Sequence, residues 1–279
     1  MKKFNIGLQL YSVRDDLAAD FEGTLKKVSE MGYEYVEFAG YYDKSAKEIK
    51  EILDNYSLKC ISVHQGPTPF FAEGNKIIDF MAELGIKYCV IPWYERAKLE
   101  YGTPVWDETI ENFKKYSAAL AQKGIKTLYH NHDFEFDKID GKCIFDRLYE
   151  TLDSDILNPQ IDTCWVHYAG YDPSEYIEKF ADRLDVLHLK DFVCNNLGGG
   201  PAYALIDGDG KEIPKPSKED NEFKFVPLGM GRQDFKKILE AAEKTGIHTL
   251  IVEQDASVDR PPMEAAEISR RYLKDTFGL

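Results

Sequence analysis

The sequence predicts a single (β/α)₈ barrel, and three observations support this fold class. Eight short runs of β-branched and aromatic residues alternate with segments of helical periodicity, which predicts a parallel sheet. Eight such units in about 250 residues match the size of a closed barrel. The first run is followed by Tyr11-Ser12-Val13-Arg14, and not by the glycine-rich phosphate loop that is typical of a doubly wound open sheet.

The strands are the most clearly marked elements. Four of them come directly after a glycine that ends a helical pattern, where a residue with positive φ completes the last turn; these are Gly32, Gly85, Gly124 and Gly246. In chain order we expect strands at Asn5–Leu10, Tyr35–Phe38, Leu58–Val63, Lys87–Pro92, Lys126–His132, Pro159–Cys164, Asp185–Lys190 and Thr249–Glu253.

The segments between the strands carry apolar residues three and four positions apart. This spacing predicts helices that pack one face against a sheet. The stripes are Phe21-Leu25-Val28-Met31, Ile49-Ile52-Leu53-Tyr56, Ile77-Ile78-Met81-Leu84, Ile110-Phe113-Tyr116-Leu120 and Phe235-Ile238-Leu239-Ala242. Ser45 and Glu48 have the spacing of a capping box at the start of the second helix.

One segment, residues 192–227, interrupts the alternation. It is rich in turn formers, including Gly198-Gly199-Gly200-Pro201. Because it follows the seventh strand, it lies over the face of the barrel where active sites are built. It is equally open to interpretation as a lid or as a surface excursion, such as a hairpin or a subunit contact. The prediction is thus one domain, residues 1–279, with one insertion after strand seven.

The composition excludes several classes of protein. Forty-nine Asp and Glu against 35 Lys and Arg give a net charge of −14, which disfavours nucleic acid as a partner. An apolar content of 43% with 13% aromatic residues does not fit a disordered chain. No run approaches the roughly 20 apolar residues of a membrane span. The N-terminus lacks a signal-peptide pattern and the five cysteines are scattered, so we expect a cytoplasmic protein.

Histidines and carboxylates gather at the carboxyl ends of the predicted strands. Five of the six histidines lie there, namely His64, His130, His132, His167 and His188. They are accompanied by Glu37, Asp162, Asp191 and Glu253. Imidazoles interleaved with carboxylates have the composition of a divalent metal site, and mixed nitrogen and oxygen ligands suit Mn²⁺, Co²⁺, Fe²⁺ or Zn²⁺ better than Ca²⁺. Since no HExxH motif is present, the site must be assembled from separate strands.

Six motifs occur in barrel order along nearly the whole chain. They are Gly7-Leu8-Gln9-Leu10-Tyr11-Ser12, Tyr129-His130-Asn131-His132-Asp133-Phe134-Glu135-Phe136, Ile161-Asp162-Thr163 with Trp165 and Gly170, His188-Leu189-Lys190-Asp191, Gly229-Met230-Gly231 with Asp234-Phe235, and Val252-Glu253. Together they resemble the xylose-isomerase-like (β/α)₈ barrels, a superfamily that includes sugar isomerases and epimerases, inosose dehydratases and endonuclease IV.

The resemblance implies one divalent metal ion (Mn²⁺, Co²⁺, Zn²⁺ or Mg²⁺) held by strands five to eight. Asp162, His188 and Glu253 match the last three ligand positions. Many members place a glutamate in strand five, where this chain has His130 and His132 on one face of the strand. We predict His130 as the ligand, with His132 or Glu135 as alternatives. Glu135 is equally open to a role as a cap or ion-pair partner in its loop.

The same resemblance implies a mechanism. The metal ion would chelate a carbonyl and an adjacent hydroxyl, and a base would take the α-proton to give an enediolate. Glu253, His132, Lys190 and Glu135 are the candidates for acid–base catalysis. Lys190 suits a base or an oxyanion stabiliser, or equally an ion-pair partner of Asp162 or Asp191. The imidazole in strand five weakens the case for an epimerase that exchanges protons between two glutamates.

The expected substrate pocket contains further polar and aromatic residues. Gln9, Tyr11, Glu37, His64, Trp93 and Trp165 are the candidates for substrate contact. Aromatic faces stack on sugar rings, although Trp93 and Trp165 are also typical of simple packing.

The main functional prediction is a metal-dependent isomerase or epimerase acting on a sugar or cyclitol. The alternative is a lyase on the same scaffold, which dehydrates an inosose or eliminates from a 3-keto-glycoside. A nuclease of the endonuclease IV kind and a non-catalytic sugar sensor are less favoured. We expect a small-molecule partner and neither nucleic acid nor a membrane, and a homo-oligomer is left open.

Overall fold

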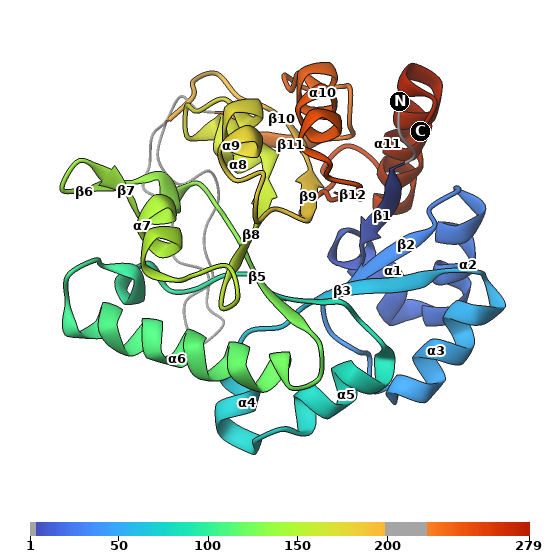
Figure 1. Ribbon diagram of the computed structural model, residues 1–279. Coiled ribbons are helices and arrows are strands. Elements are labelled where there is room, and N and C mark those ends of the chain that lie inside the picture. Colours follow the sequence, from blue (N-terminus) through green and yellow to red (C-terminus); the bar gives the residue numbers. More distant parts are fainter. Residues whose placement is uncertain (1–3, 199–221) are drawn as a thin grey trace.

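The computed structural model describes residues 4–198 and 222–279. In these residues, eight parallel strands close into a barrel in the order β1-β12-β9-β8-β5-β4-β3-β2, as Figure 1 shows. The strands are β1 (Asn5–Gln9), β2 (Tyr35–Phe38), β3 (Lys59–His64), β4 (Tyr88–Ile91), β5 (Lys126–His130), β8 (Asn158–Asp162), β9 (Val186–Leu189) and β12 (Thr249–Val252). All eight predicted strands are present, and the predicted fold class is confirmed.

The helices pack around the outside of the barrel. They are α1 (Arg14–Ala19), α2 (Phe21–Glu30), α3 (Ala46–Asn55), α4 (Thr68–Glu73), α5 (Lys76–Leu84), α6 (Pro104–Ala121), α7 (Ile144–Thr151), α8 (Thr163–Tyr168), α9 (Pro173–Lys179), α10 (Phe235–Thr245) and α11 (Pro262–Phe277). The capping box of Ser45 and Glu48 is present at the start of α3. Within the described residues, no helix is long and apolar enough to cross a membrane.

The interior of the barrel is divided into an apolar floor and a polar layer. Leu128, Val186 and Ile251 belong to a small buried apolar cluster. Side chains two positions further along a strand point to the same side, so His130, His188 and Glu253 lie directly above this floor. The apolar cluster therefore closes the barrel beneath the polar side chains, and they face the carboxyl ends of the strands.

The ends of the insertion pair with each other. β10 (Asp191–Val193) and β11 (Lys224–Val226) form an antiparallel two-stranded sheet, which agrees with a hairpin at the base of the insertion. Phe192 and Phe225 pack there against Trp165 and Tyr168 of α8. The lid interpretation concerns residues 199–221, which lie outside the described residues. A second short hairpin consists of β6 (Lys138–Ile139) and β7 (Lys142–Cys143).

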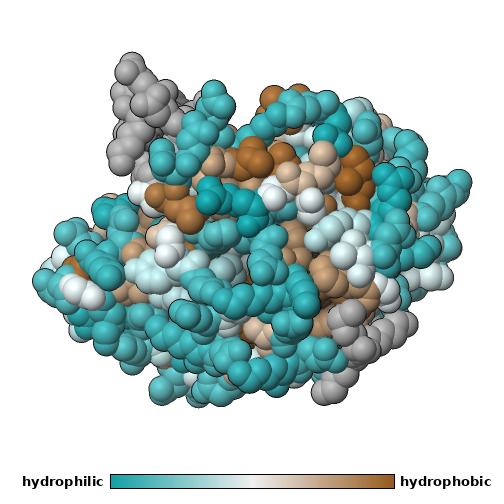
Figure 2. All heavy atoms as spheres, turned by 90° about the horizontal axis from the view of Figure 1, so that it is seen from above, coloured by the Kyte–Doolittle hydropathy of each residue, from teal (hydrophilic) through white to brown (hydrophobic). Residues whose placement is uncertain are grey.

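The surface agrees with the acidic, polar composition. On the face shown in Figure 2, hydrophilic residues dominate and hydrophobic surface occurs in small patches. Several exposed charges are held in ion pairs along or between helices, such as Lys47 with Glu51 and Lys244 with Glu178. Most charged side chains are solvated at the surface, whereas a smaller acidic group is buried in the barrel.

Candidate active site

Four side chains from separate strands converge above the apolar floor. His130 ends β5, Asp162 ends β8, His188 lies in β9, and Glu253 directly follows β12. Each is buried, and each offers a nitrogen or oxygen atom that lies within 4.8 Å of the corresponding atoms of the other three. The structure therefore brings together the four residues that the sequence predicted as metal ligands.

The spacing of these atoms suits a divalent ion. His188 Nδ1 lies 2.9 Å from Glu253 Oε2, and His130 Nε2 lies 3.5 Å from Asp162 Oδ2 and 4.0 Å from Glu253 Oε2. Ligand atoms that are each about 2.1 Å from one ion are separated by roughly 3 to 3.5 Å. Two imidazoles and two carboxylates at these distances fit a transition-metal ion without large side-chain movements.

Glu37 lies beneath this cluster and orients it. Its carboxylate is fully buried, and Gln9, Ser62 and Gln160 donate hydrogen bonds to it over 2.7, 2.5 and 2.7 Å. His188 Nε2 and His64 Nε2 approach it to 2.6 and 2.9 Å. With Nε2 held by Glu37, the Nδ1 atom of His188 faces Glu253, an arrangement typical of metal-binding histidines.

The burial of Glu37 corrects one expectation. Gln9 and Glu37 were predicted to contact substrate, but neither side chain is solvent-accessible and neither lines the pocket described below. They face the barrel interior, where the side chains of Ser62, Gln160, His64 and His188 enclose the Glu37 carboxylate together with Gln9. Their contacts assign them to the support of the histidines.

The charges of this inner network are strongly coupled. Burial alone would lower the pKa of His188, but the carboxylates of Glu37 and Glu253 outweigh it and raise the pKa to about 10. Burial would raise the pKa of Glu37, yet the imidazoles of His64 and His188 hold it well below its usual value. Without a metal ion, the network is thus held together by an imidazolium between two carboxylates.

Lys190 adds a second cation beside the cluster. Its ammonium lies 2.8 Å from Asp162 Oδ2, 2.8 Å from Glu253 Oε2 and 2.9 Å from Asp255 Oδ1. The ion-pair partner predicted as one alternative, Asp162, is confirmed. Asp255 was not predicted, although it lies two positions after Glu253 and therefore had the spacing to point the same way.

Asp191, the other expected partner of Lys190, has a different role. Its carboxylate accepts hydrogen bonds from the backbone N–H groups of Phe192, Gly229, Gly231 and Gln233. It therefore holds together the loop between β11 and α10. A Cβ on Gly231 would lie 2.2 Å from Asp191 Oδ1, so this loop requires a glycine there. The expectation that Asp191 converges on the cluster was wrong.

Strand five ends earlier than predicted, and this separates the alternative ligands. β5 stops at His130, and Asn131 turns its Oδ1 to accept the backbone N–H of Asp162 over 3.0 Å. His132 follows in the loop, with its ring centroid 5.3 Å from that of His130. It lies beside the four-residue cluster and outside it. Burial, together with the Lys190 ammonium, lowers the pKa of His132 to about 3, so this imidazole is neutral near pH 7.

Glu135 lies on the far side of the loop from the cluster. Tyr129 Oη donates to its Oε1 over 2.6 Å, and the backbone N–H of His132 donates to its Oε2 over 2.8 Å. Both oxygens are thus engaged, and Glu135 does not line the pocket. Of the roles left open for it, the structure places it as a cap of its own loop.

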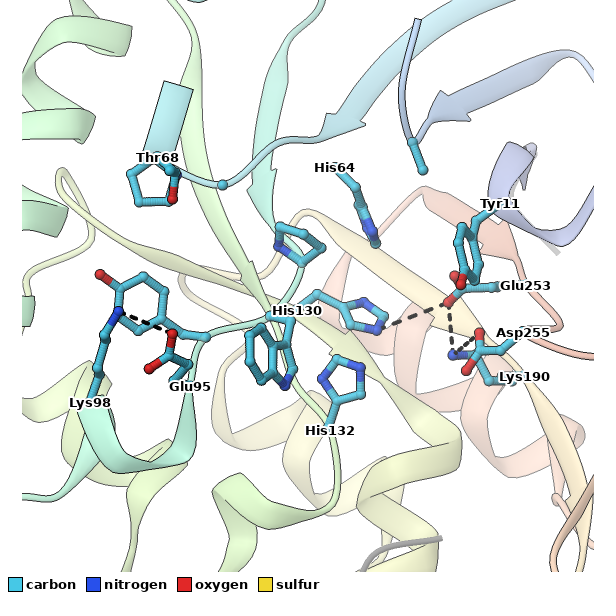
Figure 3. Close-up of a pocket in the computed structure, with 16 residues that line it drawn as sticks. Tyr11, His64, Thr68, Glu95, Lys98, His130, His132, Lys190, Glu253 and Asp255 are labelled. Atoms are coloured by element: carbon cyan, nitrogen blue, oxygen red, sulfur yellow. Dashed lines mark hydrogen bonds and ion pairs between the residues drawn. The ribbon is translucent and has the colours of Figure 1, made fainter. Parts of the chain in front are cut away.

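A pocket of about 580 Å³ opens above the cluster. Figure 3 shows Glu253, Asp255 and Lys190 at one end, His130 in the middle, and Thr68, Glu95 and Lys98 at the other end. Of the residues predicted for the site, the pocket is lined by Tyr11, His64, Trp93, His130, His132, Lys190 and Glu253. Trp165 is fully buried, and Lys190 Nζ lies 5.4 Å from the centroid of its ring.

His167 does not belong to this pocket. It lies in α8, just past the carboxyl end of β8, and its Nδ1 is 2.7 Å from Gln233 Oε1. The chain turns into a helix directly after Asp162, whose Oδ1 caps that helix at the N–H groups of Cys164 and Trp165. This turn carries His167 away from the barrel axis.

Residues 25–276 match the Xylose isomerase-like TIM barrel family. The chain belongs to this family. As a member of the xylose isomerase-like barrels, it is similar to the inosose dehydratase of Clostridium beijerinckii, with 25% identity over 281 residues that cover 93% of this chain and 90% of that enzyme. The inosose dehydratase of Geobacillus thermodenitrificans is also 25% identical, with the same coverage of both chains.

Solved structures of xylose isomerase-like barrels share the fold. A sugar phosphate isomerase/epimerase from Parabacteroides distasonis superimposes with a TM-score of 0.76 at 23% identity, covering 98% of this chain and 94% of that chain. The IOLI protein, whose structure contains a zinc atom, superimposes with a TM-score of 0.68 at 14% identity, covering 97% of each chain. The fold of this chain is therefore shared with these structures over nearly its whole length.

Two residues of this xylose isomerase-like site were missed from the sequence. Gln160 lies in β8 two positions before Asp162, and its Oε1 approaches both His64 Nε2 and His130 Nδ1 at 3.0 Å. Asp255 contacts Lys190 as described above. The signal for both was present, because each lies two residues from a predicted ligand on a strand or its extension.

The buried carboxyl of Glu135 makes the stability of this barrel depend on pH. Burial raises the pKa of Glu135 to about 8, although the hydrogen bonds from Tyr129 and His132 oppose this. The folded state therefore holds this proton more tightly than the unfolded state. Its contribution to stability is complete below about pH 4.5 and is lost as the pH rises through 8, on the order of 4 kcal/mol in all.

We expect Glu135→Gln to flatten this dependence. A glutamine can accept from the N–H of His132 and donate to Tyr129, but it does not titrate. Urea unfolding at pH 5.5 and pH 8.5 should show a smaller loss of stability in the variant than in the wild type. The exposed Glu51→Gln is the control and should leave the difference unchanged. An equal loss in the wild type and in Glu135→Gln would contradict the assignment.

Proposed function

We propose that the protein is a metal-dependent lyase that removes water from a polyhydroxylated cyclic ketone of the inosose class. The observation that carries the proposal is that two carboxylates and an ammonium lie together at the inner end of the pocket. Glu253, Asp255 and Lys190 lie together at one end, whereas the middle is lined by the imidazoles of His64, His130 and His132. The 25% identity with inosose dehydratases over nearly the whole chain supports the same choice.

An epimerase needs a proton-transferring group on each face of the substrate carbon. Here the residue from strand five is His130, and burial holds its pKa well below the usual value, with the neighbouring His188 adding to the effect. A neutral imidazole of this kind is a poor partner for Glu253 in a symmetric proton exchange. An elimination needs a base and an acid close together, which is the arrangement at the charged end.

Each residue of the site would have its own role in the dehydration. A divalent ion held by His130, Asp162, His188 and Glu253 would polarise the ketone oxygen and make the neighbouring C–H more acidic. A carboxylate at the charged end, Glu253 or Asp255, takes that proton. The C–O bond on the next carbon breaks, and the Lys190 ammonium protonates the departing hydroxide to give water. Because Lys190 lies within 2.9 Å of both carboxylates, the abstracted proton can then restore the ammonium.

The test is incubation of Mn²⁺-loaded protein with an inosose in D₂O. We expect a product that is one water lighter, and we expect EDTA to abolish its formation. Deuterium incorporation into an inosose of unchanged composition would instead support an isomerase or epimerase.

Lys190→Gln separates the two chemical steps. The variant should lose dehydration by roughly 10²- to 10⁴-fold, the usual contribution of a general acid, while exchange of the α-proton persists. Lys98→Gln, at the other end of the pocket, is the matched control and should dehydrate the inosose normally. Equal loss of exchange and dehydration in Lys190→Gln would assign Lys190 to another role.

A further inference from the structure

The pocket is longer than the proposed reaction requires. A six-carbon ring with its hydroxyl groups has about a dozen heavy atoms and needs at most roughly 360 Å³, even at the volume of a liquid water per atom. The pocket has about 580 Å³. As Figure 3 shows, the cluster around Glu253 occupies only one end, and the pocket continues past His130 towards Thr68, Glu95 and Lys98.

Next in sequence to Thr68 and Glu95 of the far end, the pocket has an aromatic and apolar wall. Pro67, Pro92, Trp93 and Tyr94 line it, and we call these four residues the outer shelf. Faces of tryptophan, tyrosine and proline are the surfaces on which the C–H faces of sugar rings and the faces of aromatic rings pack. Since Trp93 is only half-buried, part of its ring is open to a ligand.

Two polar atoms beside the shelf lack partners. Trp93 Nε1 and His132 Nδ1 are buried and have no hydrogen-bond partner among the described residues. The side chain of His132 is only 8% exposed, and both residues line the pocket. A buried indole N–H without an acceptor is costly, so a hydroxyl or ether oxygen of a ligand that reaches this position would be stabilised.

The charges of the lining exclude an anionic occupant. Among the pocket-lining residues of the described chain, the two lysines are both neutralised: Lys98 by Glu95 over 3.2 Å, and Lys190 by three carboxylates. No arginine lines the pocket there. A phosphate group would therefore lose its hydration without gaining a cationic partner.

We propose that the outer shelf is a second subsite, which binds an uncharged ring attached to the reacting ring. The substrate would then be a two-ring compound without phosphate, in which the second ring is a sugar or an aryl group. This inference rests on the proposed function only in placing the reacting ring at the inner end. Both kinds of ring offer a packing face, and an ether oxygen that links either ring to the reacting ring offers an acceptor; the experiment distinguishes the two rings.

The test measures binding of inert ligands to the metal-loaded protein by calorimetry. Cellobiose offers a second sugar ring, 4-nitrophenyl β-glucoside offers an aryl ring, and glucose and glucose 6-phosphate offer a single ring without and with phosphate. We expect at least one two-ring ligand to bind roughly tenfold more tightly than glucose, and glucose 6-phosphate to bind no more tightly than glucose.

Variants of Trp93 locate the effect. Trp93→Ala should remove the advantage of the two-ring ligand and leave glucose binding unchanged, whereas Trp93→Phe, which keeps a ring but lacks the N–H, should retain part of it. Phe71→Ala removes an exposed aromatic ring outside the pocket and should have no effect. Equal affinities for one-ring and two-ring ligands, or tighter binding of glucose 6-phosphate, would overturn the inference.

The outcome is separable from that of the proposed function. If the wild type fails to dehydrate an inosose but still prefers two-ring ligands through Trp93, the reaction assignment fails and the subsite stands. If it dehydrates an inosose but shows no such preference, the subsite fails and the reaction stands.

Discussion

Glu253→Gln is expected to release the bound divalent metal and to lower dehydration by roughly 10³-fold or more. The Glu253 carboxylate lies 2.9 Å from His188 Nδ1 and 2.8 Å from Lys190 Nζ, so one side chain connects the proposed ligands to the proposed acid. Burial would raise the pKa of Glu253, but the cationic Lys190 and His188 hold it well below the usual value, so this residue is ionised at neutral pH. An amide offers neither the charge nor a second acceptor oxygen.

Elemental analysis of the purified variant and its initial rate check this prediction together. Glu240→Gln, an exposed glutamate of α10, is the matched control and should keep both the metal and the activity. A variant that retains a full complement of metal would exclude Glu253 as a ligand, and one that retains activity as well would exclude the proposed site.

Lys190→Met is expected to raise the affinity for a divalent ion by at least about tenfold while abolishing turnover. The ammonium contacts Asp162 Oδ2 and Glu253 Oε2, and Glu253 Oε2 is the oxygen that faces His188 Nδ1. A metal ion and the ammonium therefore compete for the same negative charge. Removing the ammonium leaves Asp162, Glu253 and Asp255 without this cation, which costs the metal-free protein about 3 to 5 kcal/mol of stability.

Calorimetric titration with Mn²⁺ and thermal unfolding with and without the ion measure these effects. The variant should unfold at a lower temperature than the wild type when metal-free and should recover more of its stability when metal is added. Lys98→Met, which loses the pairing with the partly exposed Glu95 and the contact with the Tyr94 ring but no contact with the cluster, should bind metal normally. Weaker metal binding by Lys190→Met would show that the ammonium supports the site instead of competing for it.

The fold could be predicted because its signals are local. Each strand is a short run of β-branched and aromatic residues, and each of Gly32, Gly85, Gly124 and Gly246 has the positive φ that its place after a helix required. The rim on which the candidate ligands lie could be predicted for a related reason. In a parallel barrel all carboxyl strand ends meet on one rim, so titratable residues at the ends of β5, β8, β9 and β12 must lie near one another.

The details of the site depend on the paths of the loops after the strands, and local sequence patterns do not encode these paths. His132 was expected to share a strand face with His130, but the strand ends because the side chain of Asn131 pairs with the backbone of Asp162. Glu135 and Asp191 lie outside the cluster, because their carboxylates accept hydrogen bonds from backbone N–H groups. A carboxylate satisfies either a metal ion or such donors, and the loop path decides which of them it reaches.

Residue type and spacing along the chain were thus enough for the barrel and its functional rim, whereas the resemblance to the xylose-isomerase-like barrels selected the four clustered side chains among the residues on that rim. The depth of each side chain was decided only by the closed barrel. In the closed barrel, Glu37 is buried beneath the histidines and Asp255 lies beside Lys190. Depth depends on how far each strand extends relative to its neighbours, and that register is set by contacts between segments far apart in the sequence.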